Sequence, residues 1–139
     1  MDIRKINDGI SVAPQIAPED LAEVAAMGFR TVINNRPDGE AADQAASSEI
    51  EAAAKAAGLA YHFVPVISGQ MTHENVDDFR KTLAASDAPA LAFCRSGTRS
   101  THLWALSQAG TLSADDIVGQ AARAGYDLAP LRPALEQDD

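Results

Sequence analysis

The sequence predicts an α/β domain of three layers, in which a mostly parallel sheet of four to five strands is flanked by helices. Short β-branched or apolar runs alternate with longer helical segments, the pattern of a parallel sheet with crossover helices. The run Ala90–Phe93 is apolar throughout, which is typical of a central strand buried on both faces. The chain has 139 residues, enough for one full hydrophobic core, so we expect a single domain over residues 1–139.

Local signals place the elements of the first half. The triplet Asn7-Asp8-Gly9 predicts a hairpin turn between two β segments. Pro18, followed by two acidic residues, is typical of a helix start, and glycines at 28 and 58 are typical of helix ends. The predicted elements are hairpin strands at 3–6 and 10–12, a helix at 18–28, a strand at 31–34 and an Ala-rich helix over about 41–57.

The second half continues the alternation. Pro65 lies in the run 61–66 and predicts an edge strand or a strand end. Thr72 predicts a helix N-cap, and Ser113 with Asp116 predicts another helix start. The remaining predicted elements are a strand at 61–66, a helix from 72 with an apolar stripe, a strand at 90–93, helices at about 99–109 and 113–125, a short helix near the two tail prolines, and a solvated acidic end at 136–139.

Composition excludes several classes of function. The net charge is −9, with 11 basic and 20 acidic residues, so a nucleic acid or an anionic membrane would be repelled. No apolar run approaches the roughly 18 residues of a membrane span, and the first residues lack a secretory signal. One cysteine cannot form an internal disulfide, so we expect a cytoplasmic protein with a reduced thiol. An anionic substrate would need a local positive site.

Such a positive site is predicted between the apolar strand and the next helix, in the segment FCRSGTRS. Cys94 ends the strand, Gly97 permits a tight turn of converging backbone N–H groups, and Arg99 adds a planar cation at the helix start. The same positive field stabilises a thiolate, the nucleophilic form of cysteine. We therefore predict Cys94 as the nucleophile with Arg99 as the cation beside it, and the anion-binding positions as Arg95, Ser96, Gly97 and Thr98.

Two further loops are expected at the same edge of the sheet, because ligands in such folds bind at the carboxyl ends of the strands. These are residues 35–40, with Arg36 and Glu40 as possible site-lining residues, and residues 67–71. The alternative for Arg36 and Glu40 is a structural ion pair. The histidines at 62, 73 and 102 lack metal-ligand spacing with one another or with Cys94, so neither a metal nor a cofactor is expected.

The Cys-x4-Arg-Ser pattern resembles a shortened form of the Cys-x5-Arg-Ser/Thr loop of protein tyrosine and dual-specificity phosphatases. A closer resemblance is to the bacterial phosphatase-like family named after the beta-lactamase hydrolase-like proteins, and it covers nearly the whole chain. It is carried by the stretches ISVAPQIAPEDL, GFRTVINNRPDGE, YHFVPV and FCRSGTRSTHLWAL. The loop alone also resembles that of rhodaneses, which often read Cys-Arg-x-Gly-x-Arg/Thr.

The phosphatase resemblance implies a protein-tyrosine-phosphatase-like fold and a phosphocysteine intermediate on Cys94. Arg99 and the loop amides would hold the equatorial oxygens, and Ser100 would assist breakdown of the intermediate. The sequence departs from the pattern in two places. Phe93 stands where phosphatases usually have His, and the loop after strand 61–66 lacks the Asp that serves as general acid. His73, slightly further on, is a possible site-lining residue.

These departures leave three functions open. The first is a phosphatase-like hydrolase of small phosphate esters. The second is a rhodanese-type sulfurtransferase with a persulfide on Cys94, because the four-residue spacing makes a smaller ring and thiosulfate needs no acid. The resembling family includes members joined to a persulfide dioxygenase, which also favours sulfur chemistry. The third is a non-catalytic oxyanion-binding module. The sequence leaves the oligomeric state open.

Overall fold

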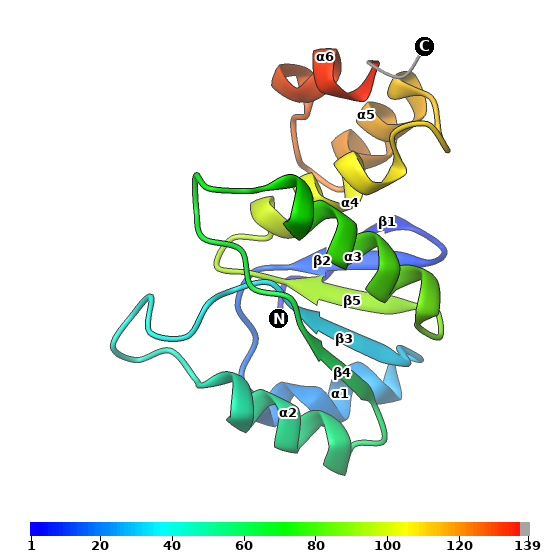
Figure 1. The fold of residues 1–139 in the computed structure, drawn as a ribbon. Coiled ribbons are helices and arrows are strands. Elements are labelled where there is room, and N and C mark those ends of the chain that lie inside the picture. Colours follow the sequence, from blue (N-terminus) through cyan, green and yellow to red (C-terminus); the bar gives the residue numbers. More distant parts are fainter. Residues whose placement is uncertain (137–139) are drawn as a thin grey trace.

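The computed structural model describes residues 1–136 and contains a five-stranded sheet in the order β1-β2-β5-β3-β4 (Figure 1). The first two strands pair antiparallel, and the other three pairings are parallel. The central strand is the apolar run that the sequence singled out. The strands are β1 (Arg4–Asn7), β2 (Ile10–Ala13), β3 (Thr31–Asn34), β4 (Ala60–Phe63) and β5 (Ala90–Phe93).

Helices cover both faces of this sheet, which gives the predicted three layers (Figure 1). One face carries η1 (Pro18–Asp20), α1 (Leu21–Ala26) and α2 (Ser47–Ala56). The other carries α3 (His73–Ala85), α4 (Thr98–Gln108), α5 (Ala114–Arg123), η2 (Ala129–Leu131) and α6 (Arg132–Leu135). The fold class predicted from the sequence is confirmed.

Alternating side chains of the inner strands divide the core into two clusters. In β5, Leu91 and Phe93 pack with α1 and α2, whereas Ala90 and Ala92 pack with the helices of the opposite face. Val32 and Ile33 of β3 divide in the same way. Because successive side chains of a strand point to opposite faces, a strand that is apolar throughout can only be buried between two layers.

Several predicted boundaries are wrong. The Ala-rich helix begins at Ser47 rather than near 41, since Gln44 bonds back to the carbonyl of Pro37 and the amide of Glu40, which holds this segment as a loop. The strand predicted at 61–66 ends at Phe63, before Pro65, which has no N–H for the ladder, although β4 does lie at the sheet edge. The acidic residues 137–139 lie outside the described residues.

The predicted caps are confirmed. Thr72 accepts from the amide of Asn75, and Ser113 accepts from the amide of Asp116. Gly97 is the N-cap residue of α4 at φ +88°, in the left-handed region that favours glycine. Over the described residues, no helix is long and apolar enough to cross a bilayer.

Candidate functional site

Four parallel strands end at the same level of the sheet. Phe93 of β5 is in register with both Ala13 and Asn34, and Asn34 is in register with Phe63. The loops that follow these residues therefore leave the sheet side by side, on the left in Figure 1. This places the segment 94–97 between the segment from Pro14 and the loop after β3.

Cys94 lies at the bottom of the β5–α4 loop. Its side chain is fully buried, and its Sγ accepts a hydrogen bond from the amide of Gly97 at 3.1 Å. The amide of Cys94 itself bonds to the carbonyl of Ala13 on β2. The turn therefore directs a backbone donor at the sulfur, as the glycine in the sequence suggested, and the N-terminus of α4 adds positive charge beside it.

Arg99 points into the loop rather than to solvent, with a side chain only 12% exposed. Its Nη1 donates to Glu40 Oε2 at 2.7 Å and to the carbonyl of Val66 at 2.8 Å, and its Nη2 donates to Glu40 Oε1 at 2.8 Å. A guanidinium has five N–H donors. Within residues 1–136 three are committed, so Nε–H and one Nη2–H remain, the parallel pair that matches two oxygens of an oxyanion.

The sulfur of Cys94 is close enough to Arg99 to affect the pKa of the guanidinium. The pKa of Arg99 is raised, chiefly by the hydrogen bond to Glu40 and to a smaller extent by the charge and hydrogen bonding of the Cys94 sulfur, against the effect of burial. The thiol of Cys94 and the guanidinium of Arg99 thus lie close enough for their charges to interact, as the Cys-x4-Arg spacing suggested.

Glu40 connects both arginines of the site. Besides the hydrogen bonds from Arg99, Glu40 accepts one from Arg36 Nε at 2.8 Å. The Nη1 of Arg36 donates to Gln15 Oε1 at 3.0 Å. The hydrogen bonds from Arg99, with weaker ones from Arg36, hold the pKa of Glu40 at about 2, although partial burial raises it. Glu40 is therefore ionised at neutral pH and orients Arg99, and the structure places Arg36 and Glu40 at the rim of the loop.

Ser100 is buried below the loop, where its hydroxyl donates to Asn35 Oδ1 at 2.8 Å. The Nδ2 of Asn35 in turn donates to the carbonyl of Val64, and the backbone amide of Asn35 donates to the carbonyl of Phe93. The sequence analysis did not single out Asn35. A buried amide directly after a strand, at the same edge as the cysteine, is the signal that could have found it.

Tyr126, which follows α5, supports the same loop from the C-terminal side. Its hydroxyl donates to the carbonyl of Ser96 at 3.0 Å, and Arg4 lies 5.1 Å from the centre of its ring. A Cβ added at Gly97 would lie 2.1 Å from the tyrosine oxygen, so the close approach also requires glycine. Burial raises the pKa of Tyr126, and the charge at Cys94 raises it further. No local sequence signal connects residues 30 positions apart.

The outer part of the loop faces solvent. Arg95, Ser96 and Thr98 are exposed, and the hydroxyls of Ser96 and Thr98 bond to each other at 3.1 Å. The carbonyl of Arg95 accepts from the amide of Gln15, which fixes the loop to the segment after β2. The four predicted anion-binding positions therefore form one continuous turn above the sulfur.

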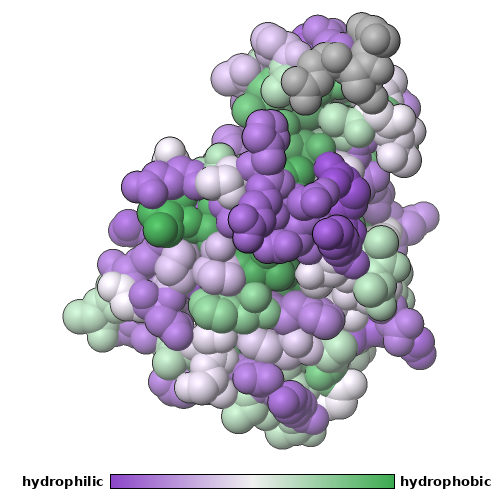
Figure 2. All heavy atoms as spheres, viewed as in Figure 1, coloured by the Kyte–Doolittle hydropathy of each residue, from purple (hydrophilic) through white to green (hydrophobic). Residues whose placement is uncertain are grey.

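His73 is not brought to this loop. It is an exposed residue of the first turn of α3 and lines a separate groove of about 940 Å³ between α3, α4 and the C-terminal helices. Figure 2 shows apolar surface between the C-terminal segment and the polar outer face of α3. Within residues 1–136, no hydrogen bond connects His73 to Cys94 or Arg99, and no cluster of three or more His, Cys, Asp or Glu side chains could hold a metal ion.

A three-layer α/β fold with a cysteine–arginine loop between the central strand and a helix defines the class of protein-tyrosine-phosphatase-like domains. One solved relative, described as a candidate phosphatase from Neisseria meningitidis, matches with a TM-score of 0.85 at 32% identity over 97% of this chain and 96% of that one. The core catalytic domain of a PP-IP phosphatase from S. cerevisiae matches with a TM-score of 0.73, at 13% identity, over 100% of this chain and 86% of that one, and so shares the fold.

The chain belongs to the family of the beta-lactamase hydrolase-like protein, phosphatase-like domain, whose model matches residues 2–111. A beta-lactamase hydrolase-like protein from Xylella fastidiosa (strain Temecula1) is 36% identical over 130 residues, 92% of this chain. The aligned part is only 30% of that relative's length. The family resemblance seen in the sequence is confirmed.

Proposed function

We propose that this chain is a cysteine-dependent phosphatase-like hydrolase that acts on small phosphate esters through Cys94. The observation that carries the proposal is the arrangement of Arg99, which Glu40 and Val66 hold with two parallel N–H donors left over beside the buried sulfur. A guanidinium that is already fixed in place stabilises the charge of a phosphoryl group in transfer. The fold shared with phosphatases supports the same class of reaction.

In the proposed reaction the Cys94 thiolate attacks phosphorus, an S–P bond forms, and the P–O bond to the leaving group breaks with its electron pair on the departing oxygen. Arg99 and the amides of the turn hold the equatorial oxygens throughout. Water then attacks phosphorus, the S–P bond breaks, and inorganic phosphate leaves with the thiolate restored. Ser100 assists this second step in the proposal, after its hydroxyl turns from Asn35, to which it donates in the structure.

The leaving oxygen takes its proton from solvent in this scheme. Within residues 1–136, the loop 67–71 contributes no carboxylate, and neither Glu74 nor Asp77 is hydrogen-bonded to the cysteine loop. General acid catalysis typically contributes 10²–10⁴-fold. The proposal therefore favours esters of acidic alcohols, such as aryl phosphates, over alkyl phosphates.

Turnover of p-nitrophenyl phosphate tests the proposal. Cys94→Ser should abolish turnover, and Arg99→Ala should lower kcat/KM by roughly 10²–10³-fold because the oxyanion loses its paired donors. Arg123→Ala, an exposed arginine on α5, controls for the lost positive charge and should leave turnover unchanged. Full turnover by Cys94→Ser would falsify the proposal.

Sulfur transfer is the second candidate, favoured by the Cys-x4-Arg spacing, which makes a smaller loop than that of tyrosine phosphatases. It requires a persulfide on Cys94 after exposure to thiosulfate, with sulfite as the released product. Mass spectrometry of the intact protein separates the candidates: a gain of one sulfur without phosphate release supports sulfur transfer. Anion binding with neither reaction leaves only a binding module.

A further inference from the structure

A cavity of about 560 Å³ opens beside the cysteine loop, between the segment after β2 and the loop after β3. It borders the candidate site because both Arg36 and Arg95 line it, one from the network that holds Glu40 and one from the cysteine loop itself. Gln15, a third lining residue, bonds to both arginines, through its side chain to Arg36 and through its amide to the carbonyl of Arg95.

Arg36 is only 5% exposed, and its donors are incompletely used. Its Nε donates to Glu40 and its Nη1 donates to Gln15, whereas Nη2 has no partner within residues 1–136. No fully buried side-chain nitrogen or oxygen of this part of the chain lacks a partner, so Nη2 must reach open space. The cavity is the open space that Arg36 lines. A buried guanidinium thus presents unpaired N–H donors to it.

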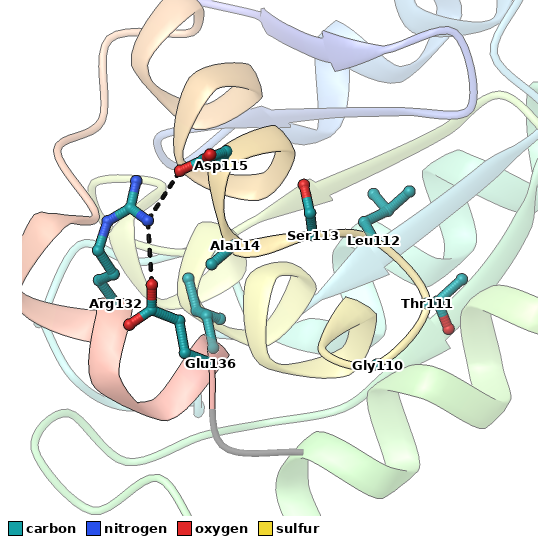
Figure 3. A pocket seen from close by; sticks show the side chains of 9 residues that line it. Gly110, Thr111, Leu112, Ser113, Ala114, Asp115, Arg132 and Glu136 are labelled. Carbon is teal, nitrogen blue, oxygen red and sulfur yellow. Dashed lines mark hydrogen bonds and ion pairs between the residues drawn. The ribbon is translucent and has the colours of Figure 1, made fainter. Parts of the chain in front are cut away.

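Arg95 is a second arginine that lines the cavity. It is exposed, and its guanidinium has no carboxylate partner among the described residues. The contrast with Arg132 is instructive, because Figure 3 shows that arginine in another cavity of about 690 Å³ with ion pairs to both Asp115 and Glu136.

Three acidic residues also line the cavity, and one of them, Asp43, lies in the same loop after β3 as Arg36. Glu19 and Asp20 belong to η1, where Asp20 accepts a hydrogen bond from the amide of Ala17. The charge of these carboxylates disfavours an anion close to them. Binding of an anionic group in the cavity therefore depends on the donors of Arg36 and Arg95.

We propose that this cavity, with Arg36 and Arg95 as donors, is a second anion-binding subsite, and that the preferred substrates are small phosphate esters that carry a further phosphate or carboxylate. The inference rests on the proposed function, because the ester phosphate occupies the cysteine loop while the second group reaches the cavity. In this proposal Arg36 and Arg95 determine which substrates bind, whereas Cys94 and Arg99 carry out the reaction.

Titration calorimetry on the Cys94→Ser protein, which cannot turn substrate over, tests the subsite. The ligands are the bisphosphates of ethane-, propane- and butanediol, each compared with the monophosphate of the matching alcohol. At least one bisphosphate should bind about tenfold or more tightly than its monophosphate, the gain of a charge-assisted hydrogen-bond pair. Arg95→Ala and, separately, Arg36→Gln should each remove most of this preference, so that a bisphosphate and its monophosphate bind each variant with similar affinity.

Arg123→Ala controls for the overall charge and should keep the preference. Equal binding of every bisphosphate and its monophosphate, beyond the advantage of two equivalent ends, overturns the subsite and leaves the hydrolase intact if p-nitrophenyl phosphate is still turned over by the native enzyme. A preference that survives Arg95→Ala and Arg36→Gln also overturns it. If the native protein neither turns over p-nitrophenyl phosphate nor binds phosphate, the proposed function itself is overturned.

Discussion

The loops after β3 and β4 leave adjacent strands and flank the same arginine, yet they differ in how they are held (Figure 1). The loop after β3 is fixed by side chains: Asn35 bonds to Val64, Arg36 to Gln15, and Glu40 to Arg99. The loop over residues 67–71 is mostly exposed, with Ile67 57% exposed, and has one internal turn bond, from Gln70 to Ile67.

The two loops therefore make different contributions to the surroundings of Arg99. One side supplies a carboxylate, Glu40, which fixes the cation before a ligand arrives, so little reorganisation is needed in the reaction. The other side supplies the carbonyl of Val66 and then an open rim without an acid. In the proposed reaction, preorganisation of the anion-binding site and protonation of the leaving group therefore depend on different loops, and the structure contains the contacts that the first requires.

The largest expected effect comes from the residue that both loops contact. Arg99→Lys keeps the charge but loses the planar fork, so Glu40 and an oxyanion can no longer be bound in parallel. We expect kcat/KM for p-nitrophenyl phosphate to fall by about 10²-fold. Arg123→Lys is the matched control. A fall of less than about threefold would show that charge alone suffices and that the fork is unimportant.

Glu40→Gln disrupts the loop after β3, which is the one that side chains hold in place. It keeps one acceptor oxygen but places an NH2 group against the guanidinium of Arg99, so we expect about a tenfold fall in kcat/KM with a smaller change in KM. The measurement is steady-state kinetics with p-nitrophenyl phosphate. Glu19→Gln, an exposed carboxylate of η1, is the control. If both variants behave alike, Glu40 has no positioning role.

The same pair of proteins gives a pH dependence of stability. The pKa of Glu40 is lowered to about 2 in the folded protein, from 4.5, so the unfolded chain binds a proton first as pH falls. The contribution of Glu40 is therefore complete above about pH 4.5 and is lost as pH falls towards 2. Urea unfolding should show native and Glu40→Gln proteins converging over that range, and a constant difference would contradict the ion pairing.

Tyr126→Phe removes only the hydroxyl that holds Ser96. We expect the free energy of unfolding to fall by about 1 kcal/mol and kcat to fall about threefold, since the loop keeps its other hydrogen bonds. Tyr61→Phe is the comparison variant, because its hydroxyl bonds to Asn34 and Ser47 and, among the described residues, makes no hydrogen bond to the cysteine loop. A loss of stability without any change in kcat would make Tyr126 a purely structural residue.

Gln70→Ala should have the smallest effect, because its exposed side chain lies in the open loop and makes no hydrogen bond within residues 1–136. We expect kcat/KM for p-nitrophenyl phosphate to stay within about twofold of the native value. A fall of tenfold or more would mean that this loop closes over substrate and that the two loops are functionally alike.

Local signals in the sequence predict most of the fold. The apolar run of β5, the caps at Thr72 and Ser113 and the left-handed Gly97 each depend on nearby residues, and the structure contains all of them. The Ala-rich helix was predicted too long because helix propensity at 41–46 is overridden by tertiary contacts, with Glu40 held by Arg36 of its own loop and by Arg99 in the first turn of α4.

The candidate site was predictable only in part. Cys94, Gly97 and Arg99 lie in one short segment, so their spacing is visible in the sequence. Asn35 lies 65 positions from Ser100, so its role depends on strand order, which periodicity does not give. The pairing of Arg99 with Glu40 and the open donors of Arg36 depend on side-chain geometry in the folded chain.

The central claim is that Cys94 forms a bond to phosphorus while Arg99 holds the oxygens. The most direct measurement is acid quenching of the native protein during turnover of p-nitrophenyl phosphate, followed by mass spectrometry of the peptide that contains Cys94. The account predicts one added phosphoryl group on that cysteine, and none in Cys94→Ser. A phosphoryl group on another residue, or continued phosphate release by Cys94→Ser, would contradict it.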